Sequence, residues 1–433
     1  MSKRAALLLI LAFIFSARAR AQTTQPSSIR IVGSEEQVQS RKRGICVNKL
    51  HPEDFVVLSP GVSWYYNWHV KGDQPPAGVN LEFVPMVWTD SPDRLQGLRE
   101  YLAAGHRPRA ILVANEPNLK GQAFISPQQC ADLHRRVHEI TRDLGIPLVG
   151  PHMAIGSAPN ASITAFDPVQ QKDVTYTFML PYLKAFFHFV GDTPVDGVGV
   201  HSYKREGEIT WSVNLVYNEF KRPVWMTEYA WWGAPTELDS LRHLVKATDF
   251  MERSSRVEAY AWFKERIGRP HLRLLTNEPG QLTPLGLAYV RMPVHDVKLY
   301  YRLPGRLNAA RYVEQTGMEI DVAPDPADFL QMISTQPGAS ITYNVAIEQT
   351  GRYELRLATT GQPGRIEVLV NNEPAGVIAI DHAGDPATTR PHGGAKPVLS
   401  EPLTLMLREG PTRVTLRLEN AGQSLSRLEW IRQ

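Results

Sequence analysis

The sequence predicts an α/β protein: a (β/α)8 TIM barrel followed by an all-β jelly-roll sandwich. Between residues 42 and 293, short apolar runs alternate with segments of helical spacing, which is the pattern of parallel strands joined by helices. After about residue 302 the helical spacing disappears, and short alternating runs separated by turn residues take over. With 433 residues, 43% of them hydrophobic, the chain is long enough to fill both cores.

The first 41 residues precede both predicted domains. Lys3 and Arg4 come before an apolar run over 5–16, and Ala19 and Ala21 place small residues where a signal peptidase requires them. The run is shorter than the roughly 20 residues that span a bilayer, so we expect residues 1–21 to be a cleaved signal peptide. Secretion, to the extracellular space or the periplasm, is the implied location. Residues 22–41 are mostly polar and are predicted to be a flexible lead-in, although 29–32 could add one short strand.

Eight apolar runs make up the predicted barrel, and its span from 42 to 293 matches the usual size of about 250 residues. Helical spacing is clearest over 127–144 and 238–253. The link between the first two runs is short, so its helix should be reduced or absent. The runs cover residues 44–47, 62–68, 81–87, 110–114, 147–149, 195–200, 223–226 and 257–263.

Two of these runs each deliver a glutamate at the end of a strand. Glu116 follows the run 110–114, and Glu228 follows the run 223–226. The carboxyl ends of barrel strands meet at one mouth, so two carboxylates far apart in the sequence would face each other there. Hydrolysis of a glycoside needs such a pair, one carboxyl group to protonate the leaving oxygen and one to attack or to activate water. The alternative for each Glu is a helix cap or a surface ion pair.

His201 and Tyr203 follow the run 195–200 and are predicted to contact Glu228. Their hydrogen bonds should hold Glu228 ionised, whereas Glu116 after an apolar strand should keep its proton near neutrality. A structural pair without a role at the site is the alternative for His201 and Tyr203.

Tryptophans are concentrated in the predicted barrel. Trp225 lies inside a strand and is predicted to be core. About half of the remaining strand-end tryptophans are expected to stack against sugar rings in a cleft. These are Trp68, Trp88, Trp231, Trp232 and Trp262.

Charge and ligand patterns exclude several classes of partner. Lys+Arg 47 against Asp+Glu 44 is nearly balanced and has no basic block, so neither nucleic acid nor an anionic membrane is expected to bind. Cys46 and Cys130 are predicted to be unpaired, inert thiols. His134 and His138 share a helix face without ligand companions, and a surface helix explains them better than a metal. We expect no metal, no cofactor and a monomer.

Six ordered sequence blocks of the predicted barrel resemble glycoside hydrolase family 128, within the clan A retaining enzymes. The resemblance implies a β-1,3-glucan as substrate, endo action and net retention, with Glu116 as acid/base and Glu228 as nucleophile. It further implies that Asn115 hydrogen-bonds the 2-hydroxyl of the sugar in the −1 site. Placement at strand ends makes further residues candidates for substrate binding: His201, Tyr203, Trp68, Trp88, Trp231 and Trp262. The blocks are VSWYYNW at 62–68, FVPMVW at 83–88, ANEPN at 114–118, VGVHSY at 198–203, PVWMTE at 223–228 and YAWF at 260–263.

Two alternatives stay open. Another clan A activity, on xylan, mannan or a β-1,4-glucan, would use the same pair of carboxylates. A non-catalytic polysaccharide-binding protein would use the barrel as a scaffold only.

The segment 302–433 resembles carbohydrate-binding modules of families 6 and 35, through the stretches 307–311, 336–343, 350–355, 368–372 and 426–431. Ala310 stands where those modules usually place an acidic calcium ligand. The region 381–394 is rich in Pro, Gly and Thr and is predicted to be a long loop. Aromatic residues available for stacking are few: Tyr312, Phe329, Tyr343, Tyr353 and Trp430.

Overall fold

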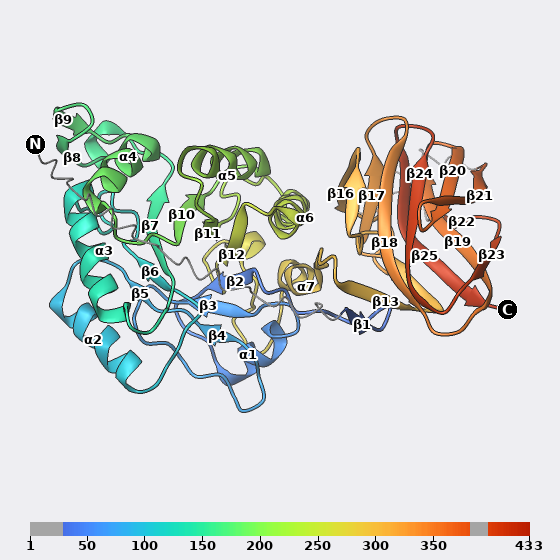
Figure 1. Cartoon of the computed structure of the whole chain (residues 1–433), viewed down its shortest axis with the longest axis horizontal. Helices are drawn as coiled ribbons and strands as arrows, with labels where there is room; N and C mark the ends of the chain where they lie inside the picture. The colour runs from blue at the N-terminus through green and yellow to red at the C-terminus, as the bar shows by residue number, and fades with distance from the viewer. Residues whose placement is uncertain (1–28, 382–396) are drawn as a thin grey trace, which may run out of the picture.

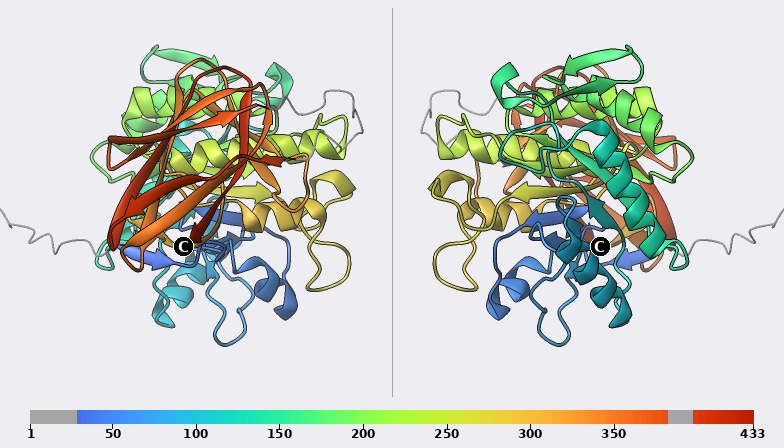
Figure 2. Two further views of the ribbon diagram at one scale, coloured as in Figure 1. Left: turned by 90° about the vertical axis from the view of Figure 1, so that its right-hand side faces the viewer. Right: turned by 90° about the vertical axis from the view of Figure 1, so that its left-hand side faces the viewer.

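The computed structural model of the chain describes residues 29–381 and 397–433, in two domains that lie end to end (Figure 1). Figure 2 views the pair along this long axis. The predicted signal peptide, lead-in residues 22–28 and nearly all of the predicted loop at 381–394 fall outside the described residues. No helix of the described part is long and apolar enough to cross a membrane.

The N-terminal domain is built on one parallel sheet of nine strands, in the order β4-β3-β2-β12-β11-β10-β7-β6-β5. The two edge strands, β4 and β5, are separated in the chain only by Val84 and Pro85, so the sheet curls until both edges belong to one stretch of the chain. Each of the eight predicted runs overlaps or borders a strand of this sheet. The strands are β2 (Arg43–Cys46), β3 (Trp64–Tyr66), β4 (Glu82–Phe83), β5 (Met86–Val87), β6 (Ile111–Val113), β7 (Leu148–Ala154), β10 (Gly197–Ser202), β11 (Val224–Tyr229) and β12 (Val257–Phe263).

Helices follow most of these strands. The predicted segments 127–144 and 238–253 correspond to α3 and α6, and α3 begins with a reciprocal capping box between Ser126 and Gln129. The first link holds only a seven-residue helix, as predicted, and residues 67–81 between β3 and β4 hold none. The helices are α1 (Pro52–Leu58), α2 (Pro92–Ala103), α3 (Pro127–Thr141), α4 (Met179–Val190), α5 (Glu206–Phe220), α6 (Glu237–Arg253) and α7 (Pro284–Arg291).

The two faces of the curled sheet bury different side chains. On β12, Ala259 and Ala261 belong to the small cluster inside the curl, whereas Tyr260 and Trp262 belong to the large cluster under the helices. This alternation follows from the pleat, which sends successive side chains to opposite faces. Trp225 is in the inner cluster, which confirms its prediction as core. Cys46 and Cys130 are buried and free, as predicted.

The C-terminal domain is a β-sandwich of two seven-stranded sheets. One sheet has the order β1-β13-β18-β24-β20-β21 with β15 on β18, where β1 (Arg30–Val32) comes from the segment before the N-terminal domain. The other has the order β16-β17-β25-β19-β22, with β14 paired to β25 and β23 paired to β19. The strands are β13 (Leu299–Leu303), β14 (Gly305–Asn308), β15 (Glu314–Thr316), β16 (Met318–Val322), β17 (Leu330–Ser334), β18 (Ala339–Ile347), β19 (Gly351–Gly361), β20 (Gly364–Val370), β21 (Glu373–Ile380), β22 (Val398–Leu399), β23 (Leu403–Leu407), β24 (Gly410–Leu418) and β25 (Gln423–Arg432).

The segment before the barrel holds the two domains together. Its strand β1 (Arg30–Val32) pairs in parallel with β13 of the sandwich. Further along, Gln37 Nε2 donates to the Val290 carbonyl at 2.9 Å, and Gln39 Nε2 donates to the Ser59 carbonyl at 2.7 Å. The prediction of a flexible lead-in is therefore wrong for residues 30–41, and the short strand weighed as an alternative is present. The polar sequence does not suggest a fixed structure, but backbone pairing with β13, some 270 residues away, holds this segment in place.

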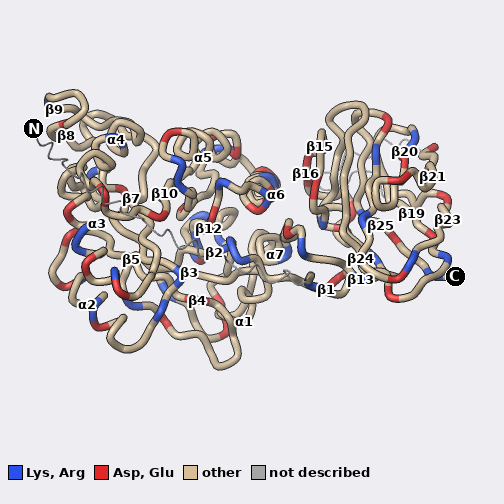
Figure 3. Tube along the Cα trace, in the orientation of Figure 1, with Lys and Arg blue, Asp and Glu red and all other residues tan. Residues whose placement is uncertain are grey.

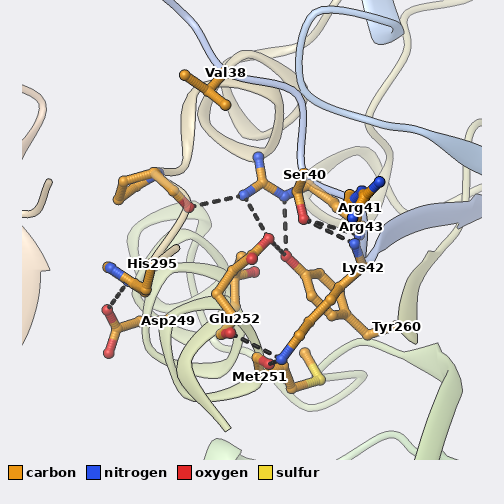
Figure 4. A network of polar contacts seen from close by, with 12 residues as sticks. Val38, Ser40, Arg41, Lys42, Arg43, Asp249, Met251, Glu252, Tyr260 and His295 are labelled. Atoms are coloured by element: carbon orange, nitrogen blue, oxygen red, sulfur yellow. Dashed lines mark hydrogen bonds and ion pairs between the residues drawn. The ribbon is translucent and has the colours of Figure 1, made fainter. Parts of the chain in front are cut away.

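A polar network at the start of β2 joins this strand to α6 and to the segment that follows α7 (Figure 4). Arg43 is fully buried, and its guanidinium donates to Tyr260 Oη at 3.0 Å, to Glu252 Oε1 at 3.0 Å and to the Pro293 carbonyl at 3.1 Å. A buried guanidinium needs all of these partners because an unpaired one would be strongly destabilising.

The domain interface is centred on α6. Asp249 of α6 accepts hydrogen bonds from Tyr312 Oη at 2.6 Å and from His295 Nε2 at 3.0 Å. On the solvent side, Arg242 pairs with Asp321 at 3.1 Å and Lys246 pairs with Glu319. Figure 3 shows basic residues of α6 opposite acidic residues of the sandwich near β16. The sandwich is therefore docked through specific polar contacts as well as through β1.

Candidate active site

Glu116 and Glu228 meet at the carboxyl ends of the parallel strands, as the sequence predicts. Glu116 lies three residues beyond the end of β6, and Glu228 is the penultimate residue of β11. Two strands, β10 and β7, separate β11 from β6 in the curled sheet. One carboxylate oxygen of each and a ring nitrogen of His201 lie within 4.8 Å of one another.

The backbone around Glu116 is held in an unusual conformation. Ala114 has φ 60° and Glu116 has φ 42°, both in the left-handed region that side chains other than glycine seldom adopt. Hydrogen bonds to neighbouring strands fix it, since Glu116 N donates to the His152 carbonyl at 2.7 Å and Asn115 N to the Trp88 carbonyl at 2.9 Å. Strain of this kind persists where the surroundings impose it and gathers at functional sites.

Glu228 is surrounded by hydrogen-bond donors. Trp68 Nε1 donates to Oε1 at 2.8 Å and Tyr66 Oη donates to it at 3.2 Å. Tyr203 Oη donates to Oε2, and His201 Nδ1 lies 3.4 Å from the same oxygen. The sequence predicted the contacts of His201 and Tyr203, but it gave Tyr66 no role because that residue lies inside the predicted run 62–68, although it is the last residue of β3.

Burial nevertheless dominates the ionisation of Glu228. Removal from water raises the pKa of the Glu228 carboxyl above its ordinary value, and the charge of Glu116 adds to this. The charge of His201 and the hydrogen bonds from Tyr203 and Trp68 lower that pKa but do not outweigh burial. The expectation that hydrogen-bond donors hold Glu228 ionised is thus corrected. The donors are present, but they only reduce the rise of the Glu228 pKa that burial causes.

His201 lies between the two carboxylates. Its Nδ1 is 3.0 Å from Glu116 Oε1 as well as 3.4 Å from Glu228 Oε2. Burial opposes protonation of the ring, but the negative charge of Glu228 and the contact with Glu116 outweigh it and raise the pKa of His201. The three side chains therefore form one contiguous polar cluster.

An open cleft of about 880 Å³ surrounds the carboxylates. Five predicted binding residues line it: Asn115, His201, Tyr203, Trp68 and Trp88. Residues that the prediction did not assign to the site line it as well: Gln122, Lys204, Glu208, Trp232 and Phe263. Trp232 was weighed as a stacking residue, and Phe263 closes one of the sequence blocks. Gln122 and Lys204 lie in loops after the strands, and Glu208 lies in the first turn of α5, none of them with a pattern that marks a site.

Asn115 is placed to contact a ligand in this cleft. Its Nδ2 donates to Gln122 Oε1 at 3.2 Å, while its Oδ1 is buried and has no hydrogen-bond partner among the described residues. A buried acceptor without a partner is unfavourable, so a donor on a bound molecule would complete the site.

Two predicted binding residues do not reach the cleft. Trp262 is fully buried under the helices, and its Nε1 donates to the Leu272 carbonyl at 2.7 Å. The pleat of β12 is the reason, because it turns Trp262 outward and Phe263 toward the cleft. Trp231 lies below the guanidinium of Arg205, 4.8 Å from the ring centroid, while its neighbour Trp232 lines the cleft instead.

Glu116, His201 and Glu228 form the one cluster of potential metal ligands within the described ranges. The contacts of 3.0 and 3.4 Å between His201 Nδ1 and the two carboxylates are those of hydrogen-bonding or ion-pair partners. His134, expected on a surface helix, is buried in α3, and its Nε2 lies 2.8 Å from the Pro194 carbonyl oxygen.

The fold and its paired carboxylates define a glycoside hydrolase. The model of the glycosyl hydrolase catalytic core family matches residues 44–289, more than half of the chain. A comparison with curated protein sequences finds no match.

Solved structures identify the family within this class. An endo-β-1,3-glucanase of family 128, subgroup II, from Sorangium cellulosum is 30% identical with a TM-score of 0.51. Its counterpart from Pseudomonas viridiflava, of the same subgroup, is 31% identical with a TM-score of 0.52. Each alignment covers 59% of this chain and 100% of that chain. The chain therefore belongs to glycoside hydrolase family 128, and the match leaves the sandwich outside the aligned part.

Proposed function

We propose that the protein is a retaining endo-β-1,3-glucanase that uses Glu116 and Glu228 in a double displacement. One observation carries this proposal: carboxylate oxygens of the two residues lie within 4.8 Å of each other in an open cleft. Retaining enzymes hold their carboxyl groups about 5–5.5 Å apart, whereas inverting enzymes leave about 6.5–9.5 Å for a water molecule. The β-1,3 linkage is supported by the two subgroup II relatives, which are named as endo-β-1,3-glucanases.

In the first step, a carboxylate oxygen of Glu228 attacks the anomeric carbon while Glu116 gives its proton to the glycosidic oxygen. The bond to the leaving chain breaks, that chain departs as an alcohol, and the sugar becomes an ester of Glu228. Trp68 and Tyr66 keep Oε1 in position, while Tyr203 and His201 contact Oε2.

In the second step, Glu116, now ionised, takes a proton from water as the water oxygen attacks the anomeric carbon. The ester bond breaks, Glu228 is restored as a carboxylate and Glu116 as an acid. Two inversions give net retention. Asn115 would hold the 2-hydroxyl of the reacting sugar through this sequence, since its buried Oδ1 needs a donor.

Trp68, Trp88, Trp232 and Phe263 would supply apolar faces for the glucan chain along the cleft. The open shape of the cleft suits attack within a chain. A sealed pocket would instead favour removal of end residues.

The test is release of new reducing ends from a panel of polysaccharides. Linear β-1,3-glucan should be cleaved, and products of several lengths should appear early. Release from xylan, mannan or a β-1,4-glucan in its place would favour another clan A activity. Binding of β-1,3-glucan without any product would favour a non-catalytic polysaccharide-binding protein.

We further propose that the curled sheet is a closed TIM-type barrel and that the sandwich is a jelly-roll module of the carbohydrate-binding kind. The contiguity of β4 and β5 and the two-sheet architecture support these assignments. Four of the five candidate aromatics of the sandwich are buried, and Phe329 alone is partly exposed. Pull-down on insoluble β-1,3-glucan should therefore weaken with Phe329→Ala if the sandwich binds sugar.

We also propose secretion, with cleavage after Ala21, and a monomeric state. The charged start, apolar run and small residues at 19 and 21 support export. N-terminal sequencing of the exported protein and light scattering test the two statements.

A further inference from the structure

A buried chain of polar side chains lies behind the two carboxylates. His201 of β10, Thr227 of β11 and His152 of β7 come from three neighbouring strands. Thr227 Oγ1 lies 3.1 Å from His201 Nε2 and 2.8 Å from His152 Nδ1, and His152 Nε2 lies 3.1 Å from the Val149 carbonyl oxygen. All three side chains are buried, so their hydrogens are placed by these contacts and not by water.

The direction of each hydrogen bond in this chain follows from the Val149 carbonyl, which is its last member. The Val149 carbonyl can only accept, so His152 carries a hydrogen on Nε2. Burial lowers the pKa of His152 to about 3, and repulsion from His201 contributes, so the ring is neutral and its Nδ1 is an acceptor. Thr227 must then donate its hydroxyl hydrogen to His152. Its oxygen is left to accept from His201, which places a hydrogen on His201 Nε2.

The position of this hydrogen determines whether His201 Nδ1 donates a hydrogen bond to the two carboxylates or accepts one. When neutral, His201 has a lone pair on Nδ1, 3.0 Å from Glu116 Oε1, and accepts a hydrogen bond from protonated Glu116. If Glu116 loses its proton to solvent, that lone pair faces the carboxylates of both Glu116 and Glu228, whose Oε2 lies 3.4 Å away, and this is unfavourable. The two groups therefore retain one proton between them.

We propose that His152 and Thr227 are positioning residues that fix His201 in the tautomer with hydrogen on Nε2, so that its Nδ1 retains the acid/base proton with Glu116. The inference rests on the proposed role of Glu116.

The sequence of β10 makes room for this arrangement. A Cβ atom at position 199 would lie 2.0 Å from His152 Nδ1, so only glycine there lets the ring reach Thr227. The position of the ring is thus built into the strand next to it.

Other ionisable groups near His201 are few. Glu116, Glu228 and His152 face it directly, and Tyr203 is hydrogen-bonded to Glu228. Lys204 and Glu208 line the same cleft and pair with each other at 3.4 Å.

The test compares Thr227→Val, which loses the hydroxyl at similar volume, with Thr227→Ser, which keeps it. In Thr227→Val, His201 Nε2 has no acceptor, so the hydrogen moves to Nδ1 and stabilises ionised Glu116. The alkaline limb of kcat/KM on β-1,3-glucan should move to lower pH by about one unit, with a loss of kcat of about tenfold or more. Thr227→Ser should keep the wild-type profile.

His152→Leu provides a second route to the same state. Without His152, the Thr227 hydroxyl no longer has to accept from His201, so it can donate to His201 Nε2 and let the ring hydrogen move to Nδ1. Its pH profile should shift in the same direction as that of Thr227→Val, and the double variant should shift no further than Thr227→Val alone. This variant also keeps the test available if Thr227→Val fails to fold.

Ring nitrogen NMR of the full chain reads the tautomer without activity. The His201 signal, assigned by its loss in His201→Gln, should report hydrogen on Nε2 in the wild type and on Nδ1 in Thr227→Val. A wild-type profile and tautomer in Thr227→Val would overturn the inference. Failure of the wild type to cleave any β-1,3-glucan would instead remove the proposed function, while the NMR result would still decide the tautomer.

Discussion

Glu228 combines two properties that are seldom found in one side chain: near-complete burial and four polar neighbours. Because burial raises its pKa in the folded state, its ionised form is less favourable there than in the unfolded chain. The associated loss of stability begins as pH rises above the ordinary glutamate pKa of about 4.3, and is complete above the folded-state pKa.

Glu228→Gln should therefore abolish activity without lowering the melting temperature, and at pH 8 the variant should melt at or above the wild type. Glu116→Gln should also lose about three orders of magnitude in kcat, with the fold intact. Thermal melts and reducing-end assays measure both. Glu258→Gln, an exposed glutamate of β12, is the matched control and should behave as wild type. Unfolding of Glu116→Gln or Glu228→Gln would mean that the carboxylate is structural.

Trp68 also affects the pKa of Glu228. Its Nε1–H hydrogen bond lowers the pKa of Glu228 against the effect of burial, so Trp68→Phe should raise that pKa further. In the wild type, the acidic limb of kcat/KM should lie above the ordinary glutamate pKa of about 4.3, and in Trp68→Phe it should move to still higher pH. A pH profile of both proteins measures this. A limb that stays in place or moves to lower pH would contradict the account.

The site could be predicted from sequence as far as strand ends define it. Glu116, Glu228, His201 and Tyr203 follow recognisable buried runs, and parallel strands bring such ends together. Trp68 and Trp88 line the cleft as expected, whereas Trp231 and Trp262 do not. The choice of Trp262 failed because the direction of its side chain depends on the alternation along β12. The alternation of Ala259 and Ala261 with larger neighbours was the signal that places Trp262 on the outer face.

At the scale of elements, close packing of β10 against β7 limits which side chain position 199 can hold. Gly199→Ala would place a Cβ atom 2.0 Å from the His152 ring, so the ring must move. We expect a loss of about 1–3 kcal/mol of stability together with reduced activity. Denaturant unfolding measures the first. Gly207→Ala in α5, where an added Cβ meets nothing within 4 Å, is the control and should be neutral or slightly stabilising. A Gly199→Ala protein as stable as the control would contradict this packing.

Helices α3 and α6 and the strands β18, β19 and β24 could be predicted because each carries its own periodicity and boundary residues. The hairpin of β8 (Thr164–Asp167) and β9 (Lys172–Thr175) was missed because it is an exposed insertion without a buried face. Strand β1 was weighed only as an alternative, since its pairing with β13 is a long-range contact that three residues do not reveal.

At the scale of the whole molecule, Asp249 joins the domains. Burial opposes its ionisation, but hydrogen bonds from His295 and Tyr312 outweigh this and lower its pKa. Its stabilisation is therefore present above the unfolded pKa of about 3.9 and is lost as pH falls through the lower folded value. Acid should release the interface only well below neutrality.

Asp249→Asn should weaken domain docking by about 1–3 kcal/mol, because the charge-assisted bonds are lost inside a buried interface. Calorimetry should resolve two unfolding transitions in the variant where the wild type has one. Lys246→Gln, which removes a solvent-side pair, should change stability by less than about 1 kcal/mol. If both substitutions had equal effects, Asp249 would not be the main polar contact that docks the two domains.

The most direct measurement is proton NMR of the first products released from a soluble linear β-1,3-oligosaccharide. Double displacement by Glu228 and Glu116 predicts that the new reducing end appears first as the β anomer and changes to the equilibrium mixture later, with no product in Glu228→Gln. First appearance of the α anomer, or cleavage that persists in Glu228→Gln, would contradict the mechanism.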